Sequence, residues 1–188
     1  MKTKVLFTVL LSIVTMFGVS AQKFSPAPNF LKGEKQINVV FDYSQVKYDG
    51  DSQDKYYKKK DQAWIDEWEG TRRENNASAF IKSLNEELTK VDVLTGAYPE
   101  AQYTIIVDVL DCKFGSFSAG MLPARPAKLK CTARIVKTGT TETLSSIALE
   151  GSQNKYSTIG TAVDFDRMYL AFDNAGETLG KQINKVLK

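Results

Sequence analysis

The chain has 188 residues, with 25 lysine and arginine residues against 22 aspartate and glutamate residues, and it has no histidine. A charge balance this even does not favour a nucleic-acid binder, which gathers an excess of basic residues on one face. The lack of histidine removes the commonest metal ligand and excludes nucleophile arrangements in which histidine is the base. We therefore expect neither a metal site nor a cofactor.

Residues 1–21 have the pattern of an export signal. Lys2 and Lys4 precede an apolar run over residues 5–19, and the small residues that end at Ala21 fit the rule for signal peptidase cleavage. The run is shorter than the roughly 20 residues of a spanning helix, which makes an uncleaved anchor the weaker alternative. Cleavage before Gln22 would lower the net charge from +3 to about +1. We expect no transmembrane segment after cleavage and an exported protein that is periplasmic, associated with the outer envelope, or secreted.

Residues 22–35 contain two prolines and a glycine without an apolar period, which predicts a flexible N-terminal arm, either a tether or an arm that covers a sheet edge. Residues 36–188 are enough for one domain with its own core. The first strand is predicted over residues 37–43, where apolar residues alternate with Asn38, Val40 and Asp42. These three side chains should face away from the apolar ones.

A long helix is predicted over residues 61–91. Asp61 is a plausible N-cap, Trp64 and Trp68 are one turn apart, and Gly70 marks a break or kink. After the break, apolar residues follow the 3.6-residue period. The segment therefore predicts an amphipathic helix that covers a sheet.

Three more strands and a second long helix follow. Residues 103–112 are apolar on both faces, which is typical of a central strand. Residues 127–137 alternate, residues 138–140 form a short hairpin connection, and residues 141–149 form the return strand. The alternation places Leu129, Cys131, Ala133 and Ile135 inward and Lys128, Lys130, Thr132 and Arg134 outward. A helix over residues 161–187 buries Met168, Phe172, Ala175, Leu179, Ile183 and Val186.

This order of elements predicts the fold class. Two helices with one apolar stripe each, and strands with one polar face, indicate an α+β two-layer sandwich. We expect a mostly antiparallel sheet of about four strands with both long helices on one face. The order of the strands in the sheet is left open, and an incomplete ferredoxin-like pairing is one possibility.

Cys112 and Cys131 are the two cysteines of the chain. Two thiols without histidine do not make an ordinary zinc site, and an exported chain meets an oxidising compartment. If the strands on either side of residues 113–126 form a hairpin centred near Met121 and Leu122, the two cysteines face each other. We therefore expect a disulfide between them.

The chain resembles small exported bacterial cell-envelope proteins of uncharacterised function. The resemblance lies in the signal peptide, the strand Val39-Val40-Phe41-Asp42-Tyr43-Ser44, the helix with Trp64 and Trp68, the strand Tyr103-Thr104-Ile105-Ile106-Val107, and the Asp164-Phe165-Asp166 entry to the last helix. It implies a bacterial envelope setting, and it carries no catalytic residues.

A candidate binding surface combines a loop with a basic strand face. The loop over residues 113–126 has two glycines and two prolines, which exclude regular structure, yet it holds four large apolar side chains. If they are exposed beside the basic residues of the next strand, they make the mixed apolar and basic patch of a partner site. The alternative is a loop that folds back over the core. The candidate residues are Phe114, Phe117, Met121, Leu122, Lys128, Lys130 and Arg134.

Two functions fit these observations. The favoured one is a non-catalytic envelope domain that binds a protein, glycan or lipid partner or has a structural role. The alternative is a small hydrolase that uses carboxylates alone, such as Asp108 with Asp111 or Asp164 with Asp166. A cleft with two facing acids of raised pKa would favour the hydrolase, and a surface without such acids would favour binding.

Overall fold

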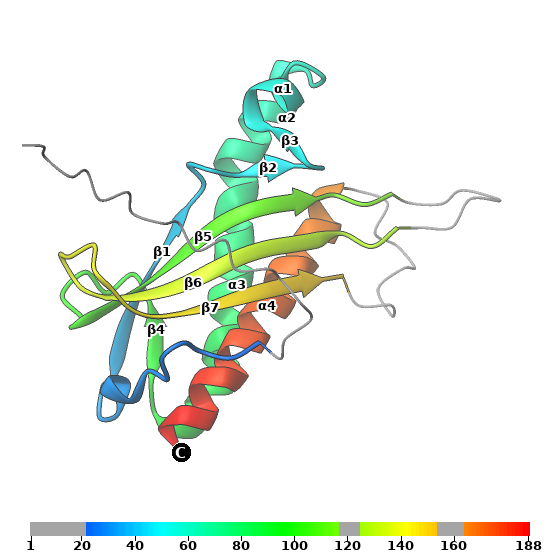
Figure 1. The fold of residues 1–188 in the computed structure, drawn as a ribbon. Coiled ribbons are helices and arrows are strands. Elements are labelled where there is room, and N and C mark those ends of the chain that lie inside the picture. The colour runs from blue at the N-terminus through cyan, green and yellow to red at the C-terminus, as the bar shows by residue number, and fades with distance from the viewer. Residues whose placement is uncertain (1–21, 117–124, 154–163) are drawn as a thin grey trace, which may run out of the picture.

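A computed structural model describes residues 22–116, 125–153 and 164–188. These residues form an α/β fold in which a mixed sheet of seven strands is covered on one face by two long helices, α3 (Arg73–Leu88) and α4 (Asp164–Leu187). In Figure 1 both helices lie behind the sheet, and the strands β5 to β7 cross in front of them. Among the described residues, no helix lies on the other face of the sheet (Figure 1).

The sheet is organised around one long strand. The strands are β1 (Gln36–Asp42), β2 (Lys47–Tyr48), β3 (Asp51–Ser52), β4 (Leu94–Gly96), β5 (Tyr103–Lys113), β6 (Lys128–Lys137) and β7 (Thr143–Ser152). One edge of β5 pairs with β6, which pairs with β7, and both pairings are antiparallel. The other edge of β5 takes β1 beside residues 104–108 and β2 beside residues 111 and 112, both parallel. β4 lies parallel to β1, and β3 lies antiparallel to β2.

The predicted α+β sandwich with about four mostly antiparallel strands is therefore wrong. The sheet has seven strands and three parallel pairings, β1 with β4, β1 with β5, and β2 with β5. A parallel pairing needs a crossover connection, and the helical segment between β1 and β5 supplies it. Three of the strands are only two or three residues long, and so short a strand shows no period in the sequence.

The helix predicted over residues 61–91 is divided into several pieces. Asp61 is the N-cap of α2 (Gln62–Glu67), because its carboxylate accepts a hydrogen bond from the Trp64 backbone N–H at 2.8 Å. The predicted break at Gly70 is confirmed, since this residue has non-helical angles (φ −89°, ψ −111°) within the turn η2 (Trp68–Arg72). α1 (Gln53–Tyr57) precedes α2 and was not predicted.

The two long helices pack closely against each other. Gly176 of α4 lies directly over α3, where an added Cβ atom would collide with the carbonyl oxygen of Phe80. Of the predicted stripe on α4, all but Val186 are fully buried. The apolar period of this helix therefore predicts its buried face correctly.

The predicted disulfide between Cys112 and Cys131 is wrong, because both thiols are free and buried. β5 and β6 form a hairpin, but their register places Cys131 opposite Val109 and Cys112 opposite Leu129. A shift in the register between Val109 and Asp111 adds to this offset. The two side chains lie on the helix-covered face without facing each other.

The residues after the predicted signal contact the far edge of the sheet. Ser25 exchanges two backbone hydrogen bonds with Ser146 of β7, at 2.9 and 3.2 Å. The Ser145 hydroxyl donates to the Pro26 carbonyl at 2.6 Å, and Leu31 is fully buried. The predicted signal peptide itself, residues 1–21, lies outside the described residues. Within the described part of the chain, no helix combines the length and the apolar character that membrane crossing requires.

Candidate functional site

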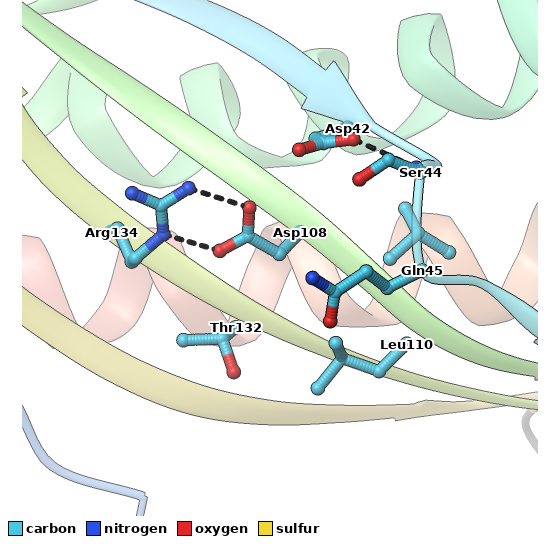
Figure 2. Close-up of a pocket in the computed structure, with 8 residues that line it drawn as sticks. Asp42, Ser44, Gln45, Asp108, Leu110, Thr132 and Arg134 are labelled. Carbon is cyan, nitrogen blue, oxygen red and sulfur yellow. Dashed lines mark hydrogen bonds and ion pairs between the residues drawn. The ribbon is translucent and has the colours of Figure 1, made fainter. Parts of the chain in front are cut away.

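A hollow of about 360 Å³ lies on the open face of the sheet, where β1 ends beside β5 and β6. Figure 2 shows side chains from three strands and from the turn after β1 around it. The lining residues are Asp42, Ser44, Gln45, Asp108, Val109, Leu110, Thr132 and Arg134. The hollow carries charged groups of both signs.

Strand register explains why these side chains meet. Asp42 of β1 lies opposite Asp108 of β5, and Asp108 lies opposite Thr132 of β6. Directly paired residues project from the same face of a sheet, so all three line one row across the open face. Val40, Ile106 and Arg134 form the next row by the same pairings.

Arg134 and Asp108 form a two-pronged ion pair (Figure 2). Arg134 Nε donates to Asp108 Oδ2 at 2.5 Å, and Arg134 Nη2 donates to Oδ1 at 2.8 Å. This bonding raises the pKa of Arg134 further above its usual value. It also offsets the repulsion between Asp108 and Asp42, which are like charges placed directly opposite each other.

Asp42 is held by the turn that follows it. The Ser44 backbone N–H donates to Asp42 Oδ1 at 2.8 Å, and this bond is the main reason why the pKa of Asp42 lies below its usual value. Asp42 is therefore ionised at neutral pH. Since Asp108 and Arg134 cancel, the charged side chains of the hollow sum to one negative charge, which belongs to Asp42.

The hollow does not supply an acid for hydrolysis. Both oxygens of Asp108 accept hydrogen bonds from Arg134, and Asp42 has a lowered pKa, whereas a general acid needs a raised one. Burial does raise the pKa of Asp49, but this residue does not line the hollow. Asp111, the predicted partner of Asp108, accepts a hydrogen bond from the Gly50 backbone N–H and does not line the hollow either.

Among the residues that the structure describes, no three histidine, cysteine, aspartate or glutamate side chains cluster as metal ligands would. The hollow itself offers two aspartates, and one of them is bonded through both oxygens to Arg134. Its chemistry is therefore that of hydrogen bonding and charge recognition.

The structure separates Phe114 from the basic residues of the predicted apolar and basic patch. Phe114 is a core residue, 2% exposed, which corrects the expectation that it lies on the surface. Its ring lies within 6.4 Å of five other rings, measured between centroids, and the nearest is Trp68 at 5.0 Å. Phe117, Met121 and Leu122 lie outside the described residues.

The basic residues of the predicted patch do lie on the outward face of β6. The predicted alternation along this strand is confirmed, because Leu129, Cys131, Ala133 and Ile135 are buried. Lys128 is exposed, and Lys130 forms an ion pair with Glu150 of β7 at 3.2 Å. Of the four predicted binding residues that the structure describes, Arg134 is the one that lines the hollow.

The other residues of the hollow were not predicted as a site. The alternation of the first strand did place Asp42 and Val40 on one face, and Asp108 was noted as a carboxylate. The information that was missing is the parallel pairing of β1 with β5, which joins residues 66 positions apart. The turn residues Ser44 and Gln45 carry no motif that marks them.

Comparisons with known proteins give structural similarities only. No family model matches the chain, and no curated protein matches it in sequence. The chain is similar to the PelC dodecamer protein from Paraburkholderia phytofirmans, at 9% identity and a TM-score of 0.40 over 85% of this chain and 96% of that one. It is also similar to a minor lipoprotein from Acinetobacter baumannii, at 15% identity and a TM-score of 0.37 over 82% and 93% of the two chains. Similarities at these TM-scores carry no argument about function.

Proposed function

We propose that the chain is an exported, non-catalytic domain of the bacterial cell envelope that binds a protein partner through the open face of its sheet. The export signal predicted over residues 1–21 supports the location. The observation that carries the binding function is the open face itself. On this face, a hollow lined by positive and negative side chains lies beside exposed apolar side chains.

The exposed apolar residues favour a protein as the partner. Val40 is 42% exposed and Leu110 is 36% exposed, and both belong to strands that form the hollow. Polar strand residues would be the ordinary choice for a face in contact with water. Apolar side chains next to polar and charged groups are instead typical of protein interfaces. The hollow does not favour a carboxylate hydrolase, because its two acids are fixed by hydrogen-bond donors.

Site-specific photo-crosslinking in cells that express the full chain tests this proposal. A photo-reactive phenylalanine analogue replaces Leu110 on the open face or, as the matched control, Tyr169 on α4, which is 37% exposed. We expect a discrete protein adduct from position 110 and none of the same mass from position 169. A thermal melt of each variant verifies that it is folded.

Two results would overturn the proposal. The first is the same adduct from both positions, because contact would then not depend on the open face. The second is the absence of any protein adduct from position 110 and also from position 40, whose side chain is the more exposed of the two.

A further inference from the structure

We infer that the hollow on the open face accepts a basic side chain, lysine or arginine, from the partner protein. This inference rests on the proposed function, since it names the chemical group that the binding face recognises.

The charge of the hollow favours a cation. Its three charged side chains are Asp42, Asp108 and Arg134, and the last two neutralise each other through two hydrogen bonds. Asp42 remains ionised, and the hydrogen bonds from Ser44 do not fill the acceptor capacity of a carboxylate, which has about four lone-pair sites on its two oxygens. A positive group that enters the hollow therefore meets one negative charge with acceptor capacity to spare.

The shape and polarity of the wall favour a cation on an aliphatic stem. Leu110 contributes an exposed apolar side chain, whereas Gln45 and Thr132 contribute an amide and a hydroxyl (Figure 2). Lysine and arginine bury their methylene groups against apolar surface and direct their charged ends to acceptors. The volume of about 360 Å³ has room for one such side chain.

An acidic ligand is the competing choice, because Arg134 lines the same hollow. Its Nε and Nη2 groups already donate to Asp108, so a carboxylate would have to share or displace them. Such a ligand would also meet the unneutralised charge of Asp42. The geometry therefore points to the cation, and charge complementarity with a basic segment of the partner follows from it.

Titration of the isotope-labelled chain, followed by NMR, tests this inference with small probes. The probes are N-acetyl-lysine methylamide, its glutamine counterpart as the neutral control, and its glutamate counterpart as the acidic one. We expect the lysine probe to shift the backbone signals of Ser44, Gln45 and Thr132, and the other two probes to shift them little. Addition of salt should lower the affinity for the lysine probe, because charges near the surface are screened.

Two variants change the charge of the hollow in opposite directions. Asp42→Asn keeps the acceptor for the Ser44 N–H and removes the charge. It should lower the affinity for the lysine probe by about fivefold, which is the upper range for an exposed ion pair. Arg134→Gln removes the charge that neutralises Asp108, and it should raise the affinity for the lysine probe by a similar factor. Asp66→Asn on α2 removes an exposed charge away from the hollow and should change nothing.

The signs of these effects decide the outcome. If the hollow instead binds an acidic ligand, both variants should have the opposite effect. The glutamate probe should then bind more tightly to Asp42→Asn and more weakly to Arg134→Gln. That result, or no response to any probe, overturns the inference. A protein adduct from position 110 together with no response to the lysine probe would leave the proposed function intact. It would overturn only the inference that the partner inserts a basic side chain.

Discussion

The helix-covered face of the sheet and its open face are built from alternate residues of the same strands. On β5, Val107 and Val109 are buried under the helices, whereas Asp108 and Leu110 project from the other side. The covered face contains apolar side chains and two thiols with no bond between them. The open face contains two ion pairs, the carboxylate of Asp42 and exposed apolar groups. The covered face is thus organised for stability, and the open face keeps features that stability alone does not explain.

Truncation of the core should give the largest difference between the two faces. Phe114→Ala removes a ring that contacts five other aromatic rings, and we expect it to lower the free energy of unfolding by about 3–5 kcal/mol. Leu110→Ala on the open face should change it by about 0.5 kcal/mol or less. Urea unfolding followed by tryptophan fluorescence measures both. Equal losses would mean that Leu110 is packed in the folded chain and would argue against an open face.

The thiols of the covered face should make the free energy of unfolding fall at alkaline pH. Burial raises the pKa of Cys131 from 9.0 to about 12, and it raises that of Cys112 as well. A raised pKa in the folded state means that the contribution to stability is full below pH 9 and is lost as the pH rises toward 12. For Cys131 alone the loss between pH 9 and pH 10.5 is about 1.5 kcal/mol, which is less than the limiting slope of about 1.4 kcal/mol for each pH unit would give, because the unfolded thiol is half ionised at pH 9.

Cys131→Ala separates this effect from other titrations. The variant is less stable at every pH because a buried side chain is truncated, but its stability should fall less steeply between pH 9 and pH 10.5. Urea unfolding at the two pH values gives the slope for each protein. Equal slopes would show that the thiol ionises as readily in the folded chain as in the unfolded one.

The covered face could largely be predicted from the sequence, because long elements repeat their pattern many times. The stripe on α4 and the alternation on β6 extend over 24 and 10 residues, so the period is well determined. Trp68 and Phe114 show the limit of this reasoning. Trp68 fits a buried helical position, whereas Phe114 follows the end of β5, where no period continues and only the tertiary fold places its ring in the core.

The open face could not be predicted because it depends on pairings between distant segments. Asp42 and Asp108 become neighbours through a parallel pairing, and a parallel partner cannot be read from a hairpin connection. The cysteines illustrate the same limit, because a register shift near Leu110 is invisible in an alternating sequence. Individual strands were therefore predictable, and the relations between them were not.

The smallest expected effect compares two ion pairs on the open face. Arg134 and Asp108 are partly shielded and joined by two hydrogen bonds, whereas Lys130 and Glu150 are mostly exposed and joined at 3.2 Å. Arg134→Gln should cost about 1 kcal/mol of unfolding free energy because it leaves a shielded carboxylate without its donors. Lys130→Gln should cost about 0.5 kcal/mol or less. Urea unfolding at low and at high salt measures both costs. If Lys130→Gln were the more costly, the Arg134 and Asp108 pair would add little to the fold, and the charge of the hollow could be altered without any loss of stability.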